Sequence, residues 1–93
     1  MDLYLKDPAA VARYTIDWGA AYLGPLGITG SAWEISPAEA GGLSLELSSH
    51  DGRMATASVG GGVAGHVYRL SNRVTLNDGS SDVRSIVLRV EER

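Results

Sequence analysis

The chain has 93 residues, a net charge of −3 and no cysteine, so it is long enough for one domain and contains no disulfide framework. Lys6 is the only lysine, and the arginines are spread along the chain rather than gathered in a stripe. This acidic balance argues against binding to a nucleic-acid backbone, and no run approaches the roughly 20 apolar residues that a membrane span needs.

The N-terminal part of the chain predicts an arm followed by two strands. Residues 1–8 are mixed polar, lack the apolar core of a signal peptide, and are expected to form a flexible or edge arm. Asp7-Pro8 favours either one helical turn or direct entry into a strand. Apolar and polar residues then alternate over 14–18, and the next strand is expected over 28–35. Pro37 ends this second strand because proline cannot donate to a ladder.

An apolar loop, residues 19–27, separates these two strands. Gly24, Pro25 and Gly27 punctuate it, and it carries three large apolar side chains, which are Tyr22, Leu23 and Leu26. Because loops usually run over the surface, these side chains either fold back as a lid on the core or form a contact patch for a partner. The lid is the favoured interpretation, and the three residues are the candidate partner contacts of the chain.

The middle of the chain predicts two further short strands. Leucines alternate with polar residues over 43–48, a Ser-His-Asp-Gly turn occupies 49–52, and small and β-branched residues fill 54–59. Three consecutive glycines, 60–62, are expected to form a flexible link to the last part of the chain.

The last third of the chain has the pattern of a long β-hairpin. Two alternating runs within 61–90 are joined by an Asn-Asp-Gly-Ser turn at 77–80. Side chains in a strand have a period of two, so each run can place one face on a core and leave the other wet. Together with the earlier strands, this parity predicts a core made of Ile16, Trp18, Trp33, Leu70, Val74, Ile86, Leu88 and Val90.

These elements predict an all-β fold: one domain over residues 1–93, folded as an immunoglobulin-like β-sandwich of six to seven antiparallel strands. Tyr68 lies where such sandwiches carry a tyrosine corner, whose hydroxyl bonds to backbone a few residues upstream. Trp33 takes the place of the buried tryptophan of these folds. The alternative is that both are simply large core residues.

Polar residues on the two arms of the hairpin form a second predicted group. Asn72 falls at inward parity, where a buried amide needs hydrogen-bond partners. Arg84 falls at the inward parity of Ile86, near a strand end, where it can meet Asp82 or a backbone carbonyl. We interpret the group as a polar network that fixes the hairpin register, with a contact to a partner subunit as the alternative. Its members are Tyr68, Asn72, Arg73, Asp82, Arg84 and Ser85.

Motifs of enzymes and cofactor sites are weak in this sequence. Gly60, Gly62 and Gly65 match G-x-G-x-x-G, but a strand rather than a helix is predicted after them, which argues against a dinucleotide site. His50 and His66 are far apart and lack the spacing of metal ligands. No nucleophile elbow is present. We therefore expect no catalytic residues, no metal and no cofactor.

The combination of motifs at the two ends of the chain resembles a family of small tailed-phage structural proteins described as fiber-tail adaptors. The similarity runs over nearly the whole chain and rests on Lys6-Asp7-Pro8, Ala10-Val11, Tyr14, Ile16-Asp17-Trp18, Trp33, Gly61-Gly62, Ala64-Gly65, Tyr68, Asn72-Arg73-Val74-Thr75, Asp82, Arg84-Ser85, Leu88 and Val90. The resemblance implies an immunoglobulin-like fold and a role in the virion or its assembly.

On this basis we expect a non-enzymatic tail or tail-fiber adaptor of a phage or prophage that acts through protein–protein contacts. Its partners would be other phage structural proteins, with self-association on the particle, and neither nucleic acid nor membrane. It would be found in the virion, or in the host cytoplasm during assembly. The alternative is a carbohydrate-binding or adhesion module, which would need an exposed aromatic platform, whereas most aromatic residues here fall at inward parity.

Overall fold

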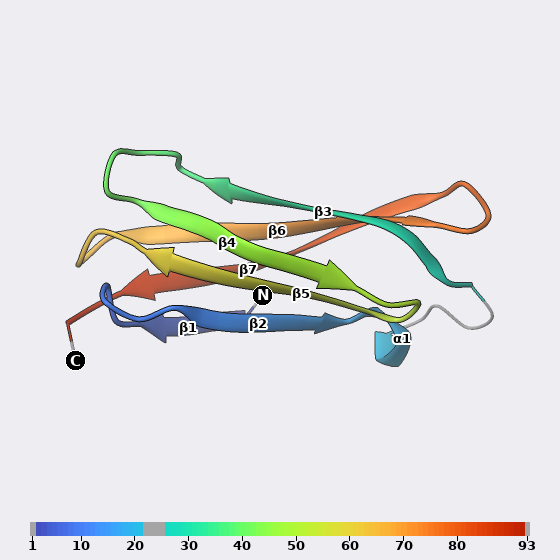
Figure 1. Cartoon of the computed structure of the whole chain (residues 1–93), viewed down its shortest axis with the longest axis horizontal. Coiled ribbons are helices and arrows are strands. Elements are labelled where there is room, and N and C mark those ends of the chain that lie inside the picture. The colour runs from blue at the N-terminus through green and yellow to red at the C-terminus, as the bar shows by residue number, and fades with distance from the viewer. Residues whose placement is uncertain (1, 22–25, 93) are drawn as a thin grey trace.

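The computed structural model describes residues 2–21 and 26–92, and it forms two β-sheets packed face to face (Figure 1). Seven strands and one four-residue helical turn make up these parts of the chain. In chain order the elements are β1 Asp2–Lys6, β2 Ala12–Asp17, α1 Trp18–Ala21, β3 Ile28–Ser36, β4 Leu43–His50, β5 Met54–Gly61, β6 Val67–Leu76 and β7 Ser81–Val90.

The strands are ordered β1-β7-β6-β3 in one sheet and β2-β5-β4 in the other. The all-β sandwich predicted from the sequence is therefore confirmed, and every pairing except one is antiparallel. The exception corrects the expectation of a wholly antiparallel fold: β1 pairs with β7 in parallel, from Asp2 opposite Ile86 to Lys6 opposite Val90. The predicted arm is thus an edge strand over most of its length.

The strands run along the longest dimension of an elongated molecule of 42 × 21 × 17 Å. Figure 1 shows that the connections β1–β2, β3–β4 and β5–β6 lie at one end, whereas α1 and the turns β4–β5 and β6–β7 lie at the other. The two long sides of the sandwich are formed by the edge strands, β1 with β2 and β3 with β4.

The hairpin β6–β7 forms the centre of the larger sheet because its alternation matches its register. Tyr68 lies opposite Leu88 and Leu70 opposite Ile86, so these side chains share the inner face. Removing a side chain of this size from water stabilises the fold by about 1.5–3 kcal/mol. The core forms two adjoining clusters, one of Ile16, Trp18, Ile28, Ala55, Val74 and Leu76, the other of Leu43, Val59, Tyr68, Leu70, Ile86, Leu88 and Val90.

Two tryptophans differ from their expected positions. Trp18 is fully buried, but it begins α1 instead of continuing the preceding strand. Trp33 is half-buried on the edge strand β3 and packs against both core clusters. It therefore bridges the two clusters instead of lying at the centre of the core.

Strand β4 contains a bulge that redirects its leucines. The register of β4 on β5 shifts between Leu45, opposite Val59, and Leu47, opposite Ser58. A one-residue slip moves the following side chains to the other face of a sheet. As a result Leu43 is buried whereas Leu47 is 72% exposed, so the leucine alternation of this segment does not give one buried face.

A buried amide joins the two sheets in the middle of the core. Asn72 on β6 is fully buried, and its Oδ1 accepts a hydrogen bond from Trp18 Nε1 at 2.9 Å. Its Nδ2 donates to Ser31 Oγ at 2.8 Å and to the Ala32 carbonyl at 3.1 Å, both on β3. These bonds satisfy the amide and hold α1, β6 and β3 in one arrangement.

The lysine at the end of β1 fastens this edge strand to the smaller sheet. Lys6 is 2% exposed, and its Nζ donates to the carbonyls of Gly61 at 2.7 Å and Asp7 at 2.9 Å. Burial lowers the pKa of the Lys6 ammonium, and the nearby Asp7 carboxylate opposes this shift. The contact with Gly61 links β1 to the end of β5.

We expect Asn72→Ala to lower the free energy of unfolding by about 2–4 kcal/mol, because it leaves the buried Trp18 N–H without its acceptor and opens a small cavity. Ser71→Ala is the matched control: it removes a hydroxyl from the neighbouring position of β6, which faces the outside of the sheet, and should cost about 1 kcal/mol or less. Urea denaturation followed by tryptophan fluorescence measures both. An Asn72→Ala protein as stable as Ser71→Ala would contradict the bridging role.

Candidate interaction site

A groove opens on the side of the sandwich between β7 and β2. Its volume is about 320 Å³, and it is lined by Tyr4, Tyr14, Thr15, Ile16, Asp17, Arg84, Ser85 and Ile86. The rings of Tyr4 and Tyr14 meet with their centroids 5.3 Å apart and close one end. Burial raises the pKa of the Tyr14 phenol, with a smaller contribution from the neighbouring Tyr4, so the Tyr14 hydroxyl remains a hydrogen-bond donor at neutral pH.

The groove lies beside the part of β7 that the described residues of β1 do not pair with. β1 pairs with residues 86–90 of β7, so the first half of β7, Ser81–Ser85, has no described strand beside it on that side. Strand β2 belongs to the other sheet and pairs only with β5 there, so its own outer edge faces the same side. The groove is therefore bounded by two strand edges rather than by loops.

Arg84 is the basic residue that lines this groove. It lies directly opposite Asn72 in the β6–β7 register, so its side chain starts on the inner face of the sheet. Its guanidinium lies 5.8 Å from the centroid of the Trp18 ring. That distance allows a cation–π attraction, which holds the arginine in place. Sequence reasoning expected Asp82 or a backbone carbonyl as its neighbour, and it missed the tryptophan.

The remaining residues of the predicted hairpin network lie apart from one another. Arg73 is exposed on the outer face of the larger sheet, where Ser85 Oγ meets Ser71 Oγ at 2.8 Å. Asp82 accepts a hydrogen bond from the Val83 N–H at 2.7 Å through its Oδ1. The expected single network is thus divided, because adjacent strand residues point to opposite faces.

The predicted contact loop lies partly outside the described residues. Tyr22 and Leu23 belong to the part that the structure does not describe. Leu26 is half-buried and packs against the core cluster that contains Trp18.

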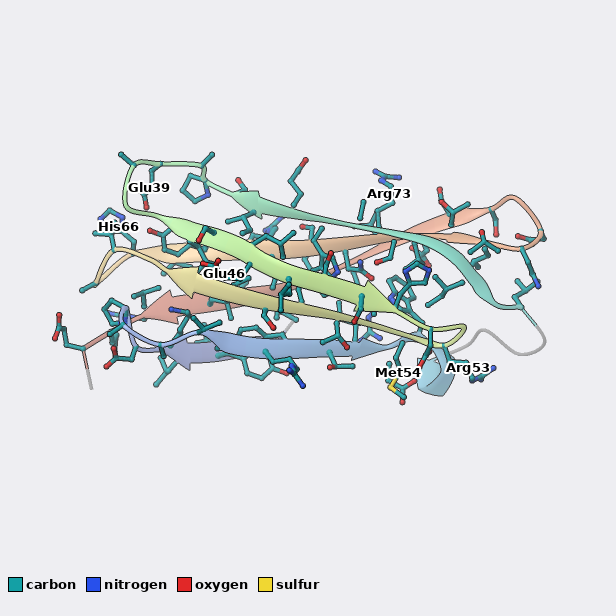
Figure 2. All side chains as sticks on the ribbon, viewed as in Figure 1. Glu39, Glu46, Arg53, Met54, His66 and Arg73 are labelled. Atoms are coloured by element: carbon teal, nitrogen blue, oxygen red, sulfur yellow. The ribbon has the colours of Figure 1, made fainter. Side chains whose placement is uncertain are left out.

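Tyr68 belongs to a polar cluster at the end of the molecule where the β3–β4 and β5–β6 connections lie. Its hydroxyl accepts a hydrogen bond from the Val63 N–H at 2.9 Å, five residues upstream, which is the geometry of a tyrosine corner. The same hydroxyl donates to Glu39 Oε2, and His66 Nδ1 lies 3.0 Å from that carboxylate oxygen. Figure 2 shows Glu39 and His66 side by side at this end.

The bonds to Glu39 shift the proton affinities of this cluster. The hydrogen bond from Tyr68, and then that from His66, holds the pKa of the Glu39 carboxyl below its usual value of 4.5. Burial, and then the bond to Glu39, raises the pKa of the Tyr68 phenol. The cluster fastens the β3–β4 connection to the β5–β6 connection. Glu39 was missed by sequence reasoning because it lies in a loop without any motif.

The glycine-rich segment has a structural explanation. Gly61 and Gly62 have φ angles of 73° and 105°, which favour glycine, and a Cβ on Gly62 would lie 2.7 Å from Val90 Cγ2. The chain therefore needs glycine to pass close over the end of β7.

Among residues 2–21 and 26–92, no group of three histidine, aspartate or glutamate side chains could hold a metal ion, and no helix is long and apolar enough to cross a membrane.

We expect the Glu39 contacts to stabilise the protein above pH 4.5 and to be lost as the pH falls through the lowered pKa of this carboxyl. The difference in unfolding free energy between the wild type and Glu39→Gln should therefore be largest near neutral pH and shrink in acid. In a Tyr68→Phe background most of this pH dependence should be absent. Denaturant melts between pH 2.5 and 7 measure it, and an equal difference at all pH values would contradict the assignment.

Comparison with known proteins gives both the fold and the family of the chain. The solution structure of the PKD domain from KIAA 1837 protein superposes with a TM-score of 0.60 at 18% identity, over all of this chain and 83% of that one, and supports the immunoglobulin-like fold. No curated protein matches the sequence. A family model described as podophage GP4 fiber-tail adaptor protein gp77 matches residues 6–89. The chain therefore belongs to the gp77 family of podophage fiber-tail adaptor proteins.

Proposed function

We propose that this protein is a non-enzymatic structural component that joins tail and tail-fiber proteins of a phage particle through protein–protein contacts. The observation that carries the proposal is the match of the fiber-tail adaptor family to residues 6–89, which is nearly the whole chain. It would be a component of the virion that assembles in the host cytoplasm, with one or several copies at the joint. Neither nucleic acid nor membrane is needed for this role.

The surface of the domain supports contact with other proteins. Its exposed apolar side chains are spread over strands rather than gathered in a closed pocket, and they include Leu3 at 63%, Leu5 at 49% and Leu47 at 72% exposure. Leu3 and Leu5 lie on the edge strand β1, opposite Val87 and Arg89 of β7. Exposed strand edges with apolar residues are surfaces on which proteins pair.

The apolar loop provides a second proposed contact. Tyr22, Leu23 and Leu26 would touch a neighbouring virion protein if the loop is a contact patch rather than a lid. A Tyr22→Ala and Leu23→Ala double variant tests this separately: weakened partner binding with an intact fold supports the patch, and loss of the folded NMR spectrum supports the lid.

We expect the purified chain, of 9.8 kDa, to join at least one of the tail or tail-fiber proteins encoded with it into a complex of fixed stoichiometry. Light scattering coupled to size-exclusion chromatography measures the mass of the chain alone and of each mixture. An unrelated PKD-type sandwich of the same size is the matched control for non-specific association. A chain that joins none of these proteins would contradict the adaptor role.

A further inference from the structure

The first half of β7 presents backbone groups to the side that β1 leaves uncovered. Val90 N–H donates to the His66 carbonyl, and Leu76 N–H donates to the Ser80 carbonyl, so the even-numbered residues of β7 direct their backbone toward β6. Glu91 N–H donates to the Lys6 carbonyl on the β1 side. Because backbone groups alternate along a strand, Val83 and Ser85 direct their N–H and C=O groups away from β6. The parallel register of Asp2 on Ile86 uses the Ser85 carbonyl, so the groups left on the uncovered side are the N–H and C=O of Val83 and the N–H of Ser85.

A side chain occupies part of the place where a strand would pair. Asp82 Oδ1 accepts the Val83 N–H at 2.7 Å. This N–H points toward the uncovered side, so the carboxylate oxygen stands where the carbonyl oxygen of a neighbouring strand would lie. Unpaired edges invite association with other chains, and charged side chains are one means of protecting them. The bond to Asp82 joins neighbouring residues and is exposed to solvent, so an incoming carbonyl can displace it.

The groove beside this edge fits the side chains of an extended segment. In a strand laid along Ser81–Ser85, alternate side chains would point into the groove of about 320 Å³ between β7 and β2. Its lining offers the hydroxyl of Tyr14 and the guanidinium of Arg84. No described carboxylate forms an ion pair with Arg84, although Asp17 lines the same groove. The fixed cation is therefore free to receive a carboxylate from outside.

We propose that β7 binds an extended segment of a tail or tail-fiber protein, which adds a strand along Ser81–Ser85 in line with β1. The segment pairs its backbone with Val83 and with the N–H of Ser85, and it places an acidic side chain against Arg84. Strand addition of this kind obtains affinity from main-chain hydrogen bonds and specificity from alternate side chains. This inference rests on the proposed adaptor function, because it names the surface and the kind of partner for that function.

The test uses proline at the residue whose N–H faces the uncovered side. Val83→Pro removes that donor but no hydrogen bond to β6, and prolines are tolerated at such edge positions. Val83→Ala is the matched control, because it shortens the same side chain and keeps the N–H. Each variant is titrated against the purified tail or tail-fiber protein that the wild type binds, with circular dichroism to check the fold. We expect Val83→Pro to weaken binding about tenfold or more, Val83→Ala less than about threefold, and Arg84→Gln several-fold.

A second measurement does not depend on the folding of any variant. In the wild-type complex, amide hydrogen exchange at Val83 and Ser85 should slow by at least about tenfold relative to the free protein, because the added strand protects both N–H groups. Unchanged exchange at both residues in a formed complex would overturn the proposal.

The outcomes separate this proposal from the adaptor function. If Val83→Pro binds as tightly as Val83→Ala, strand addition at β7 is wrong while the adaptor function stands. If the wild type binds no tail or tail-fiber protein, the adaptor function fails and the proposal fails with it. If the wild type forms a dimer that Val83→Pro abolishes, the occupant of the edge is a second copy, which overturns the assignment to a tail or fiber segment.

Discussion

The hydrogen bond between Trp18 and Asn72 is the constraint on which the rest of the sandwich depends. Two sheets that meet through apolar side chains can slide over one another at little cost, because hydrophobic contact is not directional. The amide of Asn72 removes this freedom, since it bonds to Trp18 on α1, which directly follows β2 of the smaller sheet, and to Ser31 and Ala32 on β3 of the larger sheet. A different arrangement would leave buried polar groups unpaired, at a cost of about 1–3 kcal/mol each.

The same constraint shapes the open side of the molecule. Because Asn72 lies opposite Arg84 in the β6–β7 ladder, fixing Asn72 over Trp18 also brings Arg84 to that ring. An inward-pointing charge beside an uncovered edge hinders unselective pairing with other chains, as does the carboxylate of Asp82 on Val83. The side chains of Arg84 and Asp82 still leave the backbone of β7 available to a segment with an acidic side chain that can reach Arg84. The residues that protect this edge of β7 against unselective pairing are then also the residues that select the segment that binds.

Much of the fold could be predicted from local patterns, since alternation in β6 and β7 determines which face each residue takes. The inward position of Asn72 follows from that parity alone, but its partner Trp18 is 54 residues away and carries no local signal. Leu47 shows where a local pattern fails. Leucines alternate with polar residues in β4, but a bulge on this edge strand moves Leu47 outward. Glu39 and the groove could not be predicted, because they depend on how a loop and a short first strand meet distant elements.

The comparison with the PKD domain indicates where a function specific to this family must lie. At 18% identity that domain keeps the sandwich, so residues that only maintain the core cannot distinguish an adaptor from other members of the fold. On this chain the candidates are the edge of β7 beside Val83, which no described strand covers, and Arg84, which lies on the Trp18 ring next to that edge.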